Sequence, residues 1–386
     1  MRKSKFIYFQ TLIAGFVLLI MSGLLSAAHH EVTANSNNAT IEKQYAYVSN
    51  LHSDTISMYN LNPNTGVLTP LRTPTVTTGK SPRGITVALG KYVYVANDGD
   101  NTISMYSIDP SSGELKPLRR TSTIGTGTAP TGITVHSSGK YVYVTNFGDN
   151  TVSMYSLDPD TGLLKPLSTP TITSGGWYPV RVTFDPSGKY AYIINGDDAV
   201  SMYGLDTNTG ILTPLSTPLR NMTDDPTEIV VNPSGKYAYV TNFGEAVVST
   251  FGIDPRTGIL TFLRMLPIRS AKFFTGITFA PSGKYAYVIS TGDGDNGTIS
   301  MFSLNPNTGE LTPLRTPTAT TGKHPWGITI DSSEKYAYVV NSGDDTISMY
   351  SIKNDGVLTP LRQPMVKTET APHGITLVKI RIPTGK

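Results

Sequence analysis

Apolar and polar residues alternate in short runs along most of this chain. The clearest run is Tyr-x-Tyr, with Val or Ala between the two tyrosines, and its copies lie 47 to 51 residues apart. The seven copies begin at Tyr45, Tyr92, Tyr141, Tyr190, Tyr237, Tyr285 and Tyr336. A fixed period of this length predicts one supersecondary unit that is stacked repeatedly.

Each unit contains four runs with the character of β-strands. In the third unit these runs are 132–135, 141–144, 151–155 and 164–167. All are short, rich in β-branched or aromatic residues, and bounded by Gly, Pro, Asn or Asp, as is typical of strands. The motifs Ser-Gly-Lys and Asp-Pro-x-Thr-Gly are typical of hairpin turns. We therefore expect an all-β protein, a seven-bladed β-propeller of four-stranded antiparallel blades.

The two ends of the repeat region complement each other. The first unit starts at Tyr45 with no Gly-Ile-Thr run ahead of it, whereas the chain finishes with Gly-Ile-Thr at 374–376 and no Tyr-x-Tyr after it. We predict that the C-terminal strand pairs into the first blade and closes the ring, which removes two exposed strand edges. The predicted propeller spans residues 44–382, and residues 383–386 form a short tail.

The N-terminal segment has the pattern of an export signal. Three basic residues are followed by an apolar run from Phe6 to Leu25 and by the small residues Ser26, Ala27 and Ala28. This order predicts a secretory signal peptide over residues 1–28, and residues 29–43 read as a flexible lead-in. An uncleaved N-terminal anchor is the alternative, because the run is about long enough to span a bilayer. We expect an exported protein, periplasmic, secreted or at the cell surface, that meets a membrane only through such an anchor.

Composition excludes several classes of function. The sequence has no cysteine, which rules out disulfides, thiolate metal sites and a lipid-modified cysteine. The formal net charge of +3 comes from Arg2, Lys3 and Lys5, and the remaining chain carries 28 basic and 28 acidic residues. We therefore expect no nucleic-acid partner. No cofactor-binding motif is found, and we expect no cofactor.

Candidate chemistry lies at one end of the predicted ring. Strand order places the uniform Ser-Gly-Lys and Asp-Pro-x-Thr-Gly turns at one end, and the segments that lead into each innermost strand at the other. Those leading segments vary, as loops that carry function usually do. They read Ser81-Pro-Arg-Gly, Ala129-Pro-Thr-Gly, Tyr178-Pro-Val-Arg, Asp225-Pro-Thr-Glu, Phe273-Phe-Thr-Gly, His324-Pro-Trp-Gly and Ala371-Pro-His-Gly.

Two neighbouring blades replace the last Gly of this segment with Arg181 and Glu228. Both charges should lie at or near the mouth of the central channel. The candidate catalytic residues are Arg181, Glu228, His324 and His373, and the candidate ligand-binding residues are Arg83, Lys323 and Trp326. Arg would hold an anionic or ester group, and His or Glu would move a proton or activate water.

Structural explanations for the same residues stay open. Arg181 and Glu228 can form an ion pair that only plugs the channel. His324 and His373 can make local hydrogen bonds, and Trp326 can cover the channel without binding anything.

The turns after the second strand of each unit contribute a ring of acidic residues. Such residues commonly hydrogen-bond to nearby backbone groups, which explains most of them. The longest version, Asp293-Gly-Asp-Asn-Gly-Thr298, resembles the opening of a calcium loop, with Asp293 and Asp295 as candidate ligands. No bidentate Glu follows at the expected spacing, so we expect no metal site.

The motifs Tyr141-Val-Tyr-Val-Thr-Asn146 and Tyr237-Ala-Tyr-Val-Thr-Asn242 resemble YVTN repeats. With Pro-Ser-Gly-Lys-Tyr-Ala-Tyr-Val at 233–240 and 281–288, the chain resembles the YVTN and lactonase-like propeller superfamily, which includes 6-phosphogluconolactonases, a muconate-cyclising enzyme, and exported proteins without an assigned reaction. The resemblance implies a seven-bladed propeller. Its enzymes use His, Arg and Glu at the channel mouth, which Arg181, Glu228, His324 and His373 match in type.

Two functions follow as hypotheses. The first is an exported scaffold that binds a small molecule or an extracytoplasmic partner through the variable face, since the blades are nearly uniform and the chain carries an export signal. The alternative is a lactone hydrolase, a carboxylic-ester hydrolase with a His/Arg/Glu site. Turnover of a lactone that depends on Glu228 would separate them.

Overall fold

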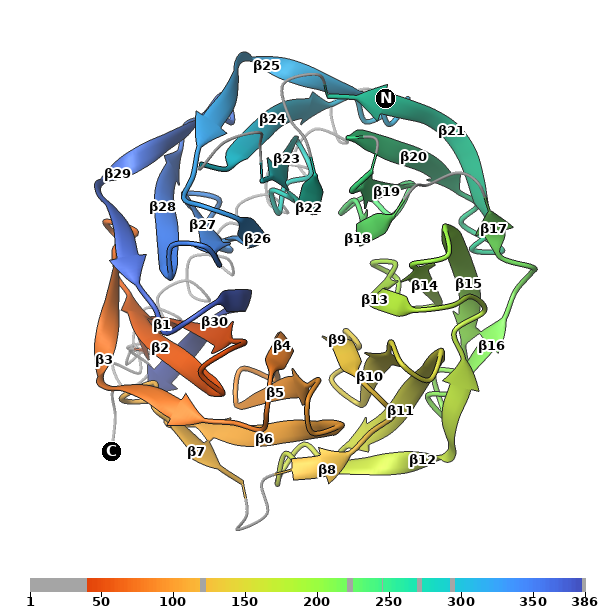
Figure 1. Cartoon of the computed structure of the whole chain (residues 1–386), viewed down its shortest axis with the longest axis horizontal. Helices are drawn as coiled ribbons and strands as arrows, with labels where there is room; N and C mark the ends of the chain where they lie inside the picture. The colour runs from red at the N-terminus through yellow and green to blue at the C-terminus, as the bar shows by residue number, and fades with distance from the viewer. Residues whose placement is uncertain are drawn as a thin grey trace, which may run out of the picture. The chain divides into compact units, whose positions relative to one another are not determined.

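A computed structural model describes residues 40–118, 123–220, 225–244, 246–268, 273–291 and 296–383. Within these residues the regular structure is all β, and no helix long and apolar enough to cross a membrane is found. Residues 42–381 form one compact unit, in which seven antiparallel sheets surround a central channel (Figure 1). The predicted seven-bladed propeller is confirmed. The predicted signal peptide lies outside the described residues.

The blades are numbered along the chain, and their strands run from the channel outward. Blade 1 holds β30 (Pro372–Pro383), β1 (Thr40–Asn50), β2 (Thr55–Leu61) and β3 (Leu68–Thr77); blade 2 holds β4 (Pro82–Ala88), β5 (Tyr92–Asn97), β6 (Thr102–Ile108), β7 (Leu115–Pro117) and β8 (Thr123–Gly125). Blade 3 holds β9 (Pro130–Val135), β10 (Tyr141–Asn146), β11 (Thr151–Leu157) and β12 (Leu164–Thr173); blade 4 holds β13 (Pro179–Phe184), β14 (Tyr190–Asn195), β15 (Ala199–Leu205), β16 (Leu212–Pro214) and β17 (Leu219–Arg220).

The remaining three blades follow the same order. Blade 5 holds β18 (Pro226–Val231), β19 (Tyr237–Asn242), β20 (Val247–Ile253) and β21 (Leu260–Pro267). Blade 6 holds β22 (Phe274–Phe279), β23 (Tyr285–Ser290), β24 (Thr298–Leu304) and β25 (Leu311–Thr320); blade 7 holds β26 (Pro325–Ile330), β27 (Tyr336–Asn341), β28 (Thr346–Ile352) and β29 (Leu358–Lys367). In blades 2 and 4 the outermost position is divided between two short strands that pair with the same neighbour.

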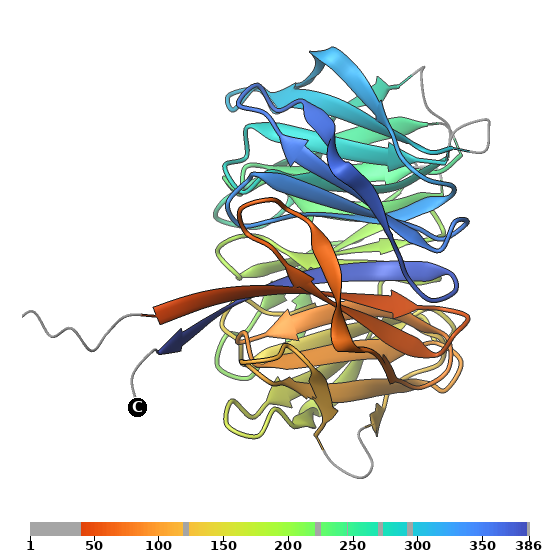
Figure 2. The same ribbon diagram turned by 90° about the vertical axis from the view of Figure 1, so that its left-hand side faces the viewer.

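The C-terminal strand closes the ring as predicted. β30 is the innermost strand of the first blade and lies beside β1, as Figure 2 also shows. The lead-in predicted over residues 29–43 overlaps the structure, because β1 already begins at Thr40. Glu42 on that part of β1 pairs with Lys379 of β30 at 2.7 Å. Residues 40–43 are too polar to read as a strand, and only their partner across the sheet defines them as one.

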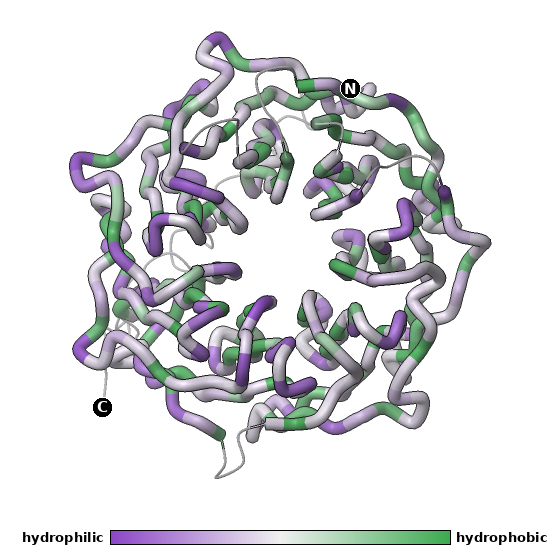
Figure 3. The backbone as a smooth tube through the Cα atoms, viewed as in Figure 1, coloured by the Kyte–Doolittle hydropathy of each residue, from purple (hydrophilic) through white to green (hydrophobic). Residues whose placement is uncertain are grey.

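The hydrophobic core is divided among the seams between neighbouring blades, and hydrophobic positions are spread around the whole ring in Figure 3. Strand alternation sends Tyr141 and Tyr143 into the seam with blade 4, while Val142 and Val144 face blade 2. Large rings thus pack against small residues around the described ring. The Tyr-x-Tyr repeat is therefore explained by packing between blades.

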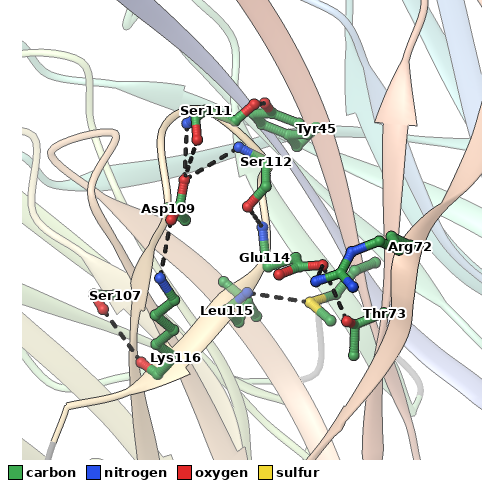
Figure 4. Close-up of polar contacts among 11 residues, drawn as sticks. Tyr45, Arg72, Thr73, Ser107, Asp109, Ser111, Ser112, Glu114, Leu115 and Lys116 are labelled. Carbon is green, nitrogen blue, oxygen red and sulfur yellow. Dashed lines mark hydrogen bonds and ion pairs between the residues drawn. The ribbon is translucent and has the colours of Figure 1, made fainter.

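The tyrosine hydroxyls also connect each blade to the next. The second tyrosine of every copy is fully buried, and its hydroxyl donates to a turn carbonyl of the following blade, as from Tyr143 to Gly210 at 2.7 Å and from Tyr338 to Gly66 at 2.8 Å. The first tyrosine packs on the same turn. Figure 4 shows Tyr45 above the turn that Asp109 organises by accepting the backbone N–H groups of Ser111 and Ser112.

Such a turn requires glycine for two reasons. Gly113 has φ of +76°, and a Cβ atom there would lie 2.3 Å from Cδ1 of Tyr45. The uniform end of the ring is therefore set by contact between blades as well as by turn geometry.

We expect Tyr143→Phe to lower the free energy of unfolding by about 1–2 kcal/mol at pH 7, because the carbonyl of Gly210 loses its buried donor. Burial raises the pKa of Tyr143 far above its usual value near 10. The unfolded chain therefore releases this proton above about pH 10 while the folded chain keeps it, so stability falls as pH rises. The variant should lose about 1.4 kcal/mol less per pH unit there than the parent. Urea unfolding at pH 7 and at alkaline pH measures both effects, and exposed Tyr178→Phe is the control at pH 7.

Candidate functional site

The innermost strands carry a change of register where they begin. In β13 the shift lies between Pro179 and Arg181, and in β18 it lies between Pro226 and Glu228. Such a β-bulge places an extra residue on one strand and redirects its side chain. In both blades the extra residue is the third of the leading segment, a position that follows Pro in six blades and Phe274 in blade 6. At this position the seven blades carry Arg83, Thr131, Val180, Thr227, Thr275, Trp326 and His373.

All seven of these residues line one pocket of about 510 Å³ at the mouth of the channel. Phe147, Ala129 and Pro226 complete much of its wall, so most of the lining is apolar. Three of the seven are threonines that are occupied by neighbouring backbone; for example, the hydroxyl of Thr275 donates to the carbonyl of Pro325 at 2.7 Å. The residues of the mouth pocket that carry a charge are Arg83, Asp98 and Arg181.

The next position along the innermost strands is Gly in five blades. Most of these glycines sit tightly against the neighbouring innermost strand, as at Gly132, where a Cβ atom would lie 2.8 Å from the carbonyl oxygen of Val180. Arg181 and Glu228 take this position in blades 4 and 5. Both residues line a second pocket of about 270 Å³, deeper in the channel.

Arg181 and Glu228 form an ion pair. The Nη2 atom of Arg181 lies 2.9 Å from Oε2 of Glu228, and the side chains are 30% and 18% exposed. Burial raises the pKa of Glu228 above its usual value, although the charge and the hydrogen bond of Arg181 act in the opposite direction. The Nε atom of Arg181 is buried and has no hydrogen-bond partner among the described residues. The pair therefore joins a carboxylate suited to accept a proton and a cation with a free donor.

His373 lies on β30 of blade 1 and lines the deeper pocket together with the ion pair. Its ring packs on Trp326 with centroids 5.0 Å apart, and its Nε2 atom is buried without a partner in the described structure. Burial, together with the positive charges of Arg83 and Arg181, holds the pKa of His373 well below its usual value. His373 is therefore neutral at pH 7. Arg181, Trp326 and His373 line both pockets and form the boundary between them.

Arg83 also reaches the mouth pocket and is paired there. Its Nε atom donates to Oδ2 of Asp98 at 2.7 Å within blade 2. Five of the seven predicted site residues thus lie together around the two pockets: Arg83, Arg181, Glu228, Trp326 and His373.

His324 and Lys323 line neither pocket. His324 is the first residue of its leading segment, and this position has a positive φ in all seven blades, 48° at His324. Its side chain is exposed, and its carbonyl accepts the N–H of Ser342. The structure therefore separates these two residues from the other five. The candidate calcium ligands Asp293 and Asp295 lie outside the described residues.

Sequence reasoning missed Asp98 and Phe147, which occupy equivalent positions in blades 2 and 3. Each directly follows the buried Asn that ends the second strand, Asn97 and Asn146. Comparing this one position among the repeats would have found them, because it also holds Leu51, Gly196, Phe243, Thr291 and Ser342. The residue at this position differs from blade to blade, as the residues of the leading segments do.

The described part of the chain holds no cluster of three or more His, Asp or Glu residues that could bind a metal ion. The two pockets present two carboxylates, two guanidinium groups and a neutral imidazole: Asp98, Glu228, Arg83, Arg181 and His373. These groups can activate water and stabilise a developing negative charge.

Comparisons with known proteins agree with this architecture. A family model described as "Lactonase, 7-bladed beta-propeller" matches residues 26–223 and 272–375. A protein of Bacteroides uniformis provisionally assigned as a 6-phosphogluconolactonase superposes with a TM-score of 0.76 and 21% identity, over 87% of this chain and 99% of its own. The periplasmic gluconolactonase of Pseudomonas aeruginosa superposes with a TM-score of 0.71 and 18% identity, over 88% of this chain and 99% of its own. At these identities the structures show a shared fold. No curated protein matches the sequence.

Proposed function

The chain belongs to the family of seven-bladed β-propeller lactonases, and on this premise we propose that it hydrolyses a lactone at the Arg181–Glu228 pair. The observation that carries the proposal is the position of this pair. Arg181 lines both the mouth pocket, which is large enough for a small cyclic ester, and the deeper pocket, which can hold water and which Glu228 lines; neutral His373 also lines both pockets.

The reaction uses groups that are already in place. Glu228 accepts a proton from a water molecule in the deeper pocket, and the water oxygen attacks the carbonyl carbon of a lactone in the mouth pocket. Arg181 stabilises the oxyanion that forms. The ring C–O bond then breaks, Glu228 returns the proton to the ring oxygen, and the product is a hydroxy acid that ionises in solvent. His373 donates or accepts one hydrogen bond without adding charge.

The binding-scaffold hypothesis, which the uniform blades favoured, has weaker support. Family membership favours the lactone hydrolase, and the five converging side chains are more than a scaffold needs. We also propose that the protein acts outside the cytoplasm, because residues 1–28 have the pattern of an export signal. The periplasmic gluconolactonase that shares the fold is consistent with this location.

The test is hydrolysis of a panel of five- and six-membered lactones, followed as acid release at constant pH after subtraction of the uncatalysed rate. We expect turnover of at least one lactone by the mature propeller. Absence of turnover on every lactone, with folding verified by circular dichroism, would refute the proposed function.

A further inference from the structure

The charges of the mouth and of the deeper pocket balance, because Arg83, Arg181 and Asp98 line the mouth pocket and Glu228 lines the deeper one. The two guanidinium groups are each matched by a carboxylate: Arg83 by Asp98 at 2.7 Å and Arg181 by Glu228 at 2.9 Å. The remaining titratable group, His373, is held neutral. A dianionic group that entered the pocket would lose its hydration without gaining a surplus of positive charge.

The rim of the mouth adds negative charge. The turns around it carry carboxylates that accept backbone N–H groups of the leading segments, as Asp54 does from Ser81 at 2.7 Å and Asp345 does from Ala371 at 2.8 Å. Asp149 accepts from Thr128, and Asp198 accepts from Asp225. Basic residues near this rim include Lys80 and Lys323, which directly precede two leading segments, and Arg220, which pairs with Asp197 at 2.7 Å. Carboxylates thus surround a mouth pocket whose two arginines are both paired, and they repel anions at low salt.

The rest of the mouth pocket suits an uncharged ring. Trp326, Phe147, Val180 and Pro226 present apolar surface, and the ring of Phe147 stacks on that of Tyr178 with centroids 4.9 Å apart. The threonine hydroxyls at the bulge position are bonded to backbone carbonyls of the next blade, as in Thr227 to Phe274 at 3.0 Å, and are not aimed at a ligand. Few polar groups remain to recognise a charged substituent.

We propose that the site selects uncharged lactones and rejects those that carry a phosphate or carboxylate group. This inference rests on the proposed function and adds the substrate class to it. The same field acts on the product: hydrolysis converts a neutral lactone into a carboxylate, which the balanced charges of the two pockets and the acidic rim favour releasing.

The experiment compares kcat/KM for an aldonolactone and for its phosphate monoester at low and at high ionic strength. We expect the uncharged lactone to be preferred by at least about tenfold at about 10 mM salt, and the preference to shrink at about 0.5 M salt, where charges are screened. Asp98→Asn leaves Arg83 unpaired and should raise the relative kcat/KM of the phosphate ester by about three- to tenfold. Asp160→Asn, on a turn at the opposite end of blade 3, should leave the ratio unchanged.

The outcomes separate the two proposals. Turnover of both lactones, with the phosphate ester equal or preferred or with a ratio insensitive to salt and to Asp98→Asn, would overturn the substrate class and leave the lactone hydrolase standing. Turnover of no lactone by the wild type would overturn the hydrolase, and the substrate class with it.

Discussion

Replacing Glu228 with Gln is expected to lower kcat for lactone hydrolysis by about 10²–10⁴-fold, the usual effect of removing a general base. Gln has the same shape and still accepts a hydrogen bond from Arg181, but it cannot take the proton of the attacking water. The wild-type rate should also fall on the acid side of its pH profile as Glu228 becomes protonated, at a pH above the usual carboxyl range because burial raises its pKa. Steady-state kinetics on any lactone turned over in the panel provide both measurements.

Glu114→Gln is the matched control for this substitution. Glu114 also pairs with an arginine, Arg72 on the outer strand β3, at 3.7 Å (Figure 4), and neither residue lines a pocket of the site. It should keep wild-type kcat. If Glu228→Gln were as active as Glu114→Gln, the Arg181–Glu228 pair would only plug the channel, and catalysis would have to be sought elsewhere.

The fold was predictable because one periodic signal determines most of it. The spacing of Tyr-x-Tyr indicates the number of blades, and the unmatched Gly-Ile-Thr at 374–376 indicates how the ring closes. What could not be read locally was the start of β1. Three of the residues 40–43 are polar, and the segment forms a strand because β30 offers it a paired edge, in which Lys379 meets Glu42. A strand that is defined only by its partner leaves no signal of its own.

The candidate site was predictable only in part, because the repeats show which residues depart from the common pattern but not which side chains face the channel. Aligning the leading segments identifies Arg181 and Glu228 as departures from Gly, but it does not show which position of a segment faces the channel. The bulge decides that: the residue at the bulge, such as Trp326 or Arg83, lines the pocket, whereas His324 before Pro adopts a left-handed backbone and stays exposed. A register shift of one residue is a property of the paired strands and cannot be seen in a single segment.

The site and the closure of the ring depend on the same strand. β30 carries His373 at its channel end, and further along it places Val378 in the seam with blade 2, near Tyr47 and Met58. Positioning of His373 against Trp326 therefore requires that β30 complete the first blade. Loss of ring closure should remove activity together with stability, even for a substitution far from the pockets.

Val378→Asp tests this dependence and should be the most destabilising single substitution proposed here. Val378 is 6% exposed, and a carboxylate there would be buried in an apolar seam without a partner, at a cost of about 4 kcal/mol or more. Lys379→Ala is the control on the adjacent residue, since it removes only a solvent-exposed ion pair, and such pairs contribute little to stability. Chemical unfolding followed by tyrosine fluorescence compares the two midpoints. A wild-type midpoint for Val378→Asp would mean that β30 does not close the ring. The placement of His373 in the two pockets would then be refuted as well, because His373 lies on the same strand.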